Sequence, residues 1–109
     1  MARSSNVIEL NMSPDTAKRI IKEIVEDSSS RVIFTTHAME RMAERRITRT
    51  QVFKCLMHGC VVEGPAPDIK GNMSLTMEVK SAGDVVSVVT ALKRNSSGNF
   101  VIVITVFGA

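Results

Sequence analysis

Apolar positions form a helical stripe near the start of the chain and alternating runs toward its end. Behind Ser13 and Pro14, apolar residues recur at intervals of three and four, as on the buried face of an amphipathic helix. These positions are Ala17, Ile20, Ile21, Ile24 and Val25. Serine is a favoured N-cap and proline a favoured first helical residue, so the pattern predicts a helix from Pro14 to about Asp27.

Two shorter helices are predicted in the middle of the chain. Thr35 or Thr36 can cap a helix that begins at His37 and ends near Arg46. Thr48 has a glutamine three residues later, which matches a capping box for a third helix through Met57. Gly59 then stands where a left-handed residue commonly ends a helix.

The remaining apolar runs have the length and alternation of strands. Residues 32–34 are mostly β-branched and indicate a brief strand or a staple into the next helix. Strands are also predicted at 60–63, 74–80, 85–92 and 100–107. The connections between them, rich in turn-forming residues, are predicted at 64–68, 81–84 and 95–99. The last run is apolar on both faces except at Thr105, so we expect it centrally in the sheet.

These elements predict an α+β fold in which two to three N-terminal helices pack on a three- to four-stranded antiparallel sheet. The length of 109 residues suits one domain, 1–109, with residues 1–12 as a loosely ordered lead-in or a short edge strand through Val7, Ile8 and Leu10. The predicted core comprises Ile20, Ile21, Ile24, Met42, Val52, Leu56, Val86, Val88, Ile102 and Ile104.

Composition narrows the classes of partner. A formal charge of +3 permits an acidic partner such as nucleic acid without requiring one. The absence of Trp and Tyr, with only four Phe, argues against sequence-specific RNA recognition by base stacking. We expect no membrane association, because no apolar run reaches spanning length, and a cytoplasmic location, because the N-terminus has no apolar signal segment.

The segment from His37 to Ile47 carries the main candidate chemistry. On a helix, His37, Arg41, Glu44 and Arg45 would share one face, with Met39, Met42 and Ala43 opposite. An imidazole can transfer a proton to or from a phosphodiester, and guanidinium groups can neutralise its phosphate oxygens. The same face can also be an ordinary solvated surface on which Arg41 pairs with Glu44.

A second group of chemistry-bearing residues is Cys55, His58 and Cys60. A zinc site needs two ligand pairs at characteristic spacing, and this single cluster is incomplete. We therefore expect no metal and no cofactor.

The pattern His-Ala-x-x-Arg-Met-x-x-Arg-x-Ile at 37–47, with the apolar strands at 84–91 and 101–106, resembles a widespread bacterial family of small domains of unknown function. That family is similar to the RelE-like and barnase-like ribonuclease toxins. The resemblance implies a RelE-like fold and a site formed by His37, Arg41 and Arg45 beside Thr105. The family usually has glycine where this chain has Arg46.

Two functions are consistent with these observations. The first is a metal-independent, toxin-like endoribonuclease, with RNA as substrate and an antitoxin-like protein as partner. The alternative is a non-catalytic module on the same fold that binds a protein or a nucleic acid. A catalytic site would require His37 and Arg41 to open onto a concave, basic pocket.

Overall fold

The computed structural model describes residues 12–95 and 98–108. The helical elements are α2 (Pro14–Asp27), the short 3₁₀ turn η1 (Ser29–Arg31), α3 (Thr36–Arg45) and α4 (Arg49–His58). The strands are β1 (Val32–Phe34), β2 (Cys60–Pro67), β3 (Met73–Ser81), β4 (Asp84–Asn95) and β5 (Gly98–Gly108). The edge strand that we considered through Val7, Ile8 and Leu10 lies outside the described residues.

The five strands form one mixed sheet in the order β1-β5-β4-β3-β2. Neighbours from β2 to β5 are antiparallel, whereas β1 runs parallel to β5, with Val32 opposite Val101. Over the described residues the fold is therefore α+β, with three α-helices and a five-stranded mixed sheet. The prediction of a purely antiparallel sheet of three to four strands was wrong, because the pairing of β1 with β5 depends on contacts between distant parts of the chain. The middle strand is β4, and β5 lies between β4 and the short β1.

The helix starts follow from local capping, and the predictions for them are confirmed. The Ser13 hydroxyl accepts from the backbone N–H of Thr16 at the start of α2. At α4, Thr48 and Gln51 form the reciprocal hydrogen bonds of a capping box. Of the two candidate caps for α3, Thr35 is the one used.

Two predictions around α4 were wrong. Gly59 has φ −74° and ψ 174°, which is extended backbone, because the chain passes directly from α4 into β2. Residues 64–67 were predicted as a turn but belong to β2. Because β2 is an edge strand, its two prolines can be accommodated without removing hydrogen bonds from the interior of the sheet.

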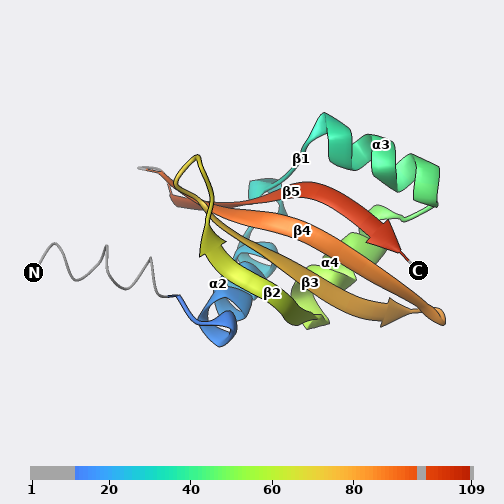
Figure 1. Ribbon diagram of the computed structural model, residues 1–109, viewed down its shortest axis with the longest axis horizontal. Helices are drawn as coiled ribbons and strands as arrows, with labels where there is room; N and C mark the ends of the chain where they lie inside the picture. The colour runs from blue at the N-terminus through green and yellow to red at the C-terminus, as the bar shows by residue number, and fades with distance from the viewer. Residues whose placement is uncertain (1–11, 96–97, 109) are drawn as a thin grey trace, which may run out of the picture.

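The helices are distributed unevenly around the sheet. Helices α2 and α4 pack together on one face, while α3 lies beside β5 at the edge (Figure 1). None of the described helices covers the opposite face, where the paired residues Thr76, Val89 and Thr105 lie. None of the helices within the described residues has the length and apolar character to span a bilayer.

The hydrophobic core lies between one face of the sheet and the two helices α2 and α4. Seven predicted core residues are buried: Ile21, Ile24, Met42, Val52, Leu56, Val86 and Val88. Ile20, Ile102 and Ile104 are only partly buried.

The prediction that Ile102 and Ile104 of β5 face the core was wrong for a local reason. Val89 pairs with Thr105 and Thr90 with Val103, so Ile104 is an extra residue that shifts the alternation. The buried residues of β5 are instead Val101, Val103 and Val106.

Candidate functional site

The first turn of α3 is attached to β5 by Thr35. Its hydroxyl accepts from the N–H of Ala38 and donates to the carbonyl of Ile104, at 3.0 Å in each case. The backbone N–H of Thr35 donates to the carbonyl of Val103 at 3.1 Å. His37 is exposed two residues after this anchor. The anchor therefore fixes the position of the helix that carries His37 against the strand that carries Thr105.

Thr105 is half-buried on the sheet face that the described helices leave uncovered. Its neighbour in the chain, Ile104, is the residue that accepts the Thr35 hydrogen bond. Helix α3 therefore lies beside β5, with Thr105 next in the chain to the residue that holds it there. Within the described part of the chain, no hydrogen bond links Thr105 to His37 or Arg41.

The orientation of α3 differs from the predicted one. Ala38 and Met42 are its buried residues, while Met39 is 49% exposed and Ala43 is also exposed. The predicted apolar face of Met39, Met42 and Ala43 was therefore wrong, because Ala38 makes the closer contact with the core. By helical geometry, Arg41 flanks the buried stripe on the same side as His37, and it is half-buried.

Arg41 has a defined partner on its own helix. Its guanidinium lies 3.0 Å from a carboxylate oxygen of Glu44, in a pair whose side chains are 43% and 60% exposed. An exposed pair at this spacing contributes less than about 1 kcal/mol to stability. The pair therefore restrains the Arg41 side chain without burying its charge, and solvent or a ligand can still reach it.

Arg45 lies at the other end of α3. Together with Arg46, Gln51, Asp84 and Gly108 it lines a surface hollow of about 270 Å³. His37 and Arg45 are eight residues apart, roughly 12 Å along the helix axis. The candidate residues therefore form a row along α3, with His37 near its beginning, Arg41 in the middle and Arg45 beside the hollow at its end.

Arg49 is a feature that the sequence analysis missed. Its guanidinium carbon lies 4.2 Å from the centre of the Phe34 ring, and Phe34 meets Phe53 edge to face with ring centres 6.0 Å apart. This cation–π contact joins β1 to α4. No local pattern signals it, because Phe34 and Arg49 belong to different elements.

The thiol and imidazole cluster does not form a metal site. Cys55 is buried and its Sγ lies 3.8 Å from the Val86 carbonyl oxygen, to which it donates, whereas Cys60 is exposed. Burial, with a smaller contribution from the Glu78 carboxylate, raises the pKa of the Cys55 thiol to about 12. Cys55 is therefore a protonated core residue. Within residues 12–95 and 98–108, no group of three or more His, Cys, Asp or Glu residues is arranged to hold a metal ion.

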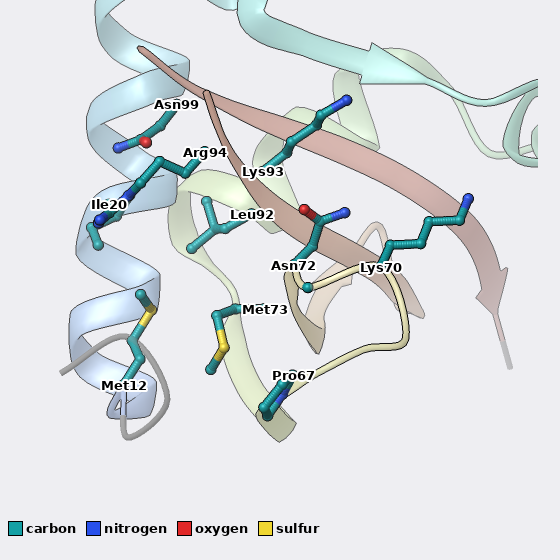
Figure 2. A pocket seen from close by; sticks show the side chains of 11 residues that line it. Met12, Ile20, Pro67, Lys70, Asn72, Met73, Leu92, Lys93, Arg94 and Asn99 are labelled. Carbon is teal, nitrogen blue, oxygen red and sulfur yellow. The ribbon is translucent and has the colours of Figure 1, made fainter. Parts of the chain in front are cut away.

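A larger hollow of about 450 Å³ lies at the opposite end of the sheet, beside α2. Figure 2 shows the side chains of Met12, Met73 and Leu92 directed into it, while the ammonium groups of Lys70 and Lys93 point away from α2. Neither hollow is lined by His37 or Arg41. The larger one has a mixed lining, apolar at Met12, Met73 and Leu92 and basic at Lys70, Lys93 and Arg94, and it contains none of the candidate residues.

The described residues form a small α+β domain with His37, Arg41 and Arg45 in a row along α3 at one edge of its sheet. The chain belongs to the family described as domain of unknown function (DUF4258), whose model matches residues 34–108. The match begins at the end of β1 and includes α3, α4 and strands β2 to β5. No curated protein and no solved structure matches the chain.

Proposed function

We propose that this protein is a metal-independent endoribonuclease of RelE-like type, with RNA as its substrate. The observation that carries the proposal is the attachment of α3 to β5 through Thr35 and Ile104. That attachment holds an exposed His37 and the adjoining cations along one edge of the sheet, with Thr105 on the neighbouring strand. An RNA strand lying along this edge would meet a proton-transfer group at one phosphate and guanidinium groups at that phosphate and the next.

In the proposed reaction His37 accepts the proton of a ribose 2′-hydroxyl. The 2′-oxygen attacks phosphorus, the bond to the 5′-oxygen breaks, and that oxygen leaves with a proton from the protonated imidazole or from water. The products are a 2′,3′-cyclic phosphate and a free 5′-hydroxyl. Arg41 binds oxygens of the reacting phosphate, where its guanidinium offsets the charge that develops in the transition state. Arg45, roughly 12 Å further along α3, binds a neighbouring phosphate of the same RNA. Thr105 lies beside the site as a hydroxyl donor.

The test uses the purified full chain with single-stranded RNA in the presence of a chelator. Wild type is expected to cleave, and His37→Ala is expected to lose cleavage with stability unchanged within about 0.5 kcal/mol, because an exposed side chain contributes little packing. The matched control is His58→Ala, which removes the other histidine, also exposed, from the end of α4. Retained cleavage by His37→Ala would exclude the proposed mechanism.

A second candidate is a non-catalytic interaction module that binds nucleic acid or an antitoxin-like protein. Two observations favour it: Arg41 is engaged by Glu44, and neither hollow is lined by His37 or Arg41. Binding of RNA without cleavage, equal in wild type and His37→Ala, would select this candidate.

A further inference from the structure

Arg46 adopts a backbone conformation that arginine rarely takes. Its φ of 57° and ψ of 41° are left-handed. The N–H of Ile47 donates to the Met42 carbonyl at 2.9 Å and the N–H of Arg46 to the Ala43 carbonyl, in the pattern of a Schellman cap. Glycine is the usual residue at this position, because a β-carbon is disfavoured there. Stability alone would therefore favour glycine over arginine at position 46.

The Arg46 side chain does not offset this strain with contacts of its own. It is exposed, and among the described residues it makes no ion pair and no side-chain hydrogen bond. The anchoring contact at this end of the helix comes instead from Ile47, which is buried. A strained residue with an unused charged side chain suggests a role outside folding.

The hollow beside Arg46 is a surface where its side chain could contact a ligand. Arg45 and Arg46 both line it, and the one carboxylate in its lining is that of Asp84, which forms no ion pair within the described chain. Two arginines against one aspartate leave the residues that line the hollow with a positive excess of charge. Asp84 can accept a hydrogen bond from a hydroxyl or an amino group, and a nucleotide carries these as well as phosphate.

We propose that Arg45 and Arg46 form a phosphate subsite at the end of α3, which holds a nucleotide of bound RNA other than the one at His37. The inference rests on the proposed ribonuclease function, because it assigns the hollow to the same RNA. The distance of roughly 12 Å along α3 from His37 to Arg45 requires a separate phosphate. The subsite contributes affinity for a longer substrate, and His37 contributes the proton transfer.

The experiment measures binding apart from cleavage. A fluorescent single-stranded RNA with 2′-O-methyl groups cannot supply the attacking hydroxyl, so its affinity for the full chain is measured by anisotropy across a salt series. Arg46→Gly is expected to weaken binding roughly tenfold at low salt, since a charge-assisted contact is lost. The slope of log affinity against log salt should fall by about 0.7, the value for one phosphate contact on a single strand.

Arg46→Gly should also raise the melting temperature by about 3–6 °C, because the left-handed strain is removed. The matched control is Ala82→Gly. Ala82 also has a positive φ, 56°, in the turn between β3 and β4, but it does not line the hollow. That variant should gain stability with no change in RNA binding. Arg46→Lys should keep most of the binding and gain no stability.

The outcomes separate this proposal from the proposed function. If wild type cleaves RNA through His37 but Arg46→Gly binds the methylated RNA with unchanged affinity and salt slope, the subsite is wrong and the ribonuclease stands. If Arg46→Gly weakens binding while His37→Ala still cleaves, the subsite stands and the catalytic assignment is wrong. Failure of wild type to bind RNA at all overturns the subsite. Weaker binding with a lowered melting temperature also overturns it, because Arg46 would then act through folding.

Discussion

The Thr35 hydroxyl donates to the carbonyl of Ile104, a residue 69 positions later in the chain, at 3.0 Å. The same oxygen accepts from Ala38 and so caps α3. One hydroxyl thus starts the helix and attaches it to β5. Attachment at this point matters because β1 ends at Phe34, and the strand edge beyond it is occupied by the helix.

Replacing Thr35 by alanine should destabilise the fold by about 1–2 kcal/mol, because the helix loses its cap and the Ile104 carbonyl loses its donor. Thr35→Ser retains the hydroxyl and should lose much less. Chemical denaturation of the two variants checks this. A similar loss in both would show that the methyl group, not the hydroxyl, is what matters.

Arg41→Lys tests whether the guanidinium shape is needed. We expect RNA cleavage to fall at least tenfold, because an ammonium group cannot bind two phosphate oxygens side by side. Stability should stay within about 0.5 kcal/mol, since the Arg41–Glu44 pair is exposed. The control is Arg19→Lys in α2, where Arg19 forms a comparable exposed pair with Glu23. If Arg41→Lys and Arg19→Lys cleaved RNA equally well, Arg41 would not be a phosphate ligand of the site.

The buried thiol of Cys55 should make the fold sensitive to alkaline pH. Its pKa is raised from 9.0 to about 12 by burial, so above pH 9 the unfolded chain releases a proton that the folded chain retains. The stability is complete below pH 9 and is lost as pH rises toward 12, by up to about 1.4 kcal/mol per unit. Denaturation at pH 8 to 10.5 measures this slope.

Alanine variants of the two cysteines test whether Cys55 causes this dependence of the unfolding free energy on pH. Cys55→Ala should flatten it, although the variant is less stable at every pH because it leaves a small cavity. Cys60→Ala should leave the slope unchanged, since Cys60 is exposed. If Cys55→Ala kept the full alkaline slope, other groups would be responsible for it.

The irregularity in β5 has a measurable consequence. Val103→Ala should cost about 2–3 kcal/mol, because Val103 is fully buried under the helices. Ile102→Ala should cost about 1 kcal/mol although it removes more atoms, because Ile102 is only partly buried on the opposite face. A larger destabilisation by Ile102→Ala than by Val103→Ala would show that Ile102 faces the core, as the sequence pattern predicted.

These residues also show where sequence reasoning succeeds and where it fails. The starts of the three α-helices within the described residues depend on residues within one turn of each other, such as Thr48 and Gln51, and they were predicted to within one residue. The face of β5 depends on the extra residue at Ile104, which only the pairing with β4 reveals. The mixed character of the sheet depends on β1, whose three residues reach their partner across most of the chain.

Some features of the candidate site were likewise predictable from local sequence, and others were not. The placement of His37, Arg41 and Arg45 along α3 follows from helical spacing and was predicted from it. Their nearness to the last strand was implied by the family resemblance alone. The left-handed Arg46 and the stacking of Arg49 on Phe34 were not. Both depend on how α3 and α4 are turned relative to the sheet. This orientation places Ala38 and Met42 of α3 and Val52, Cys55 and Leu56 of α4 in the core.

The outer edge of β2 carries Pro65 and Pro67, which lack an N–H, and two shifts in its pairing with β3. A strand from another molecule would find too few donors in line to extend the sheet there. The opposite edge is divided between the three residues of β1 and the body of α3. Neither border of the sheet is a good template for stacking copies into fibrils. We therefore expect a partner to be recognised through side chains of the described surface, whose charge and shape it has to match, and not by strand addition.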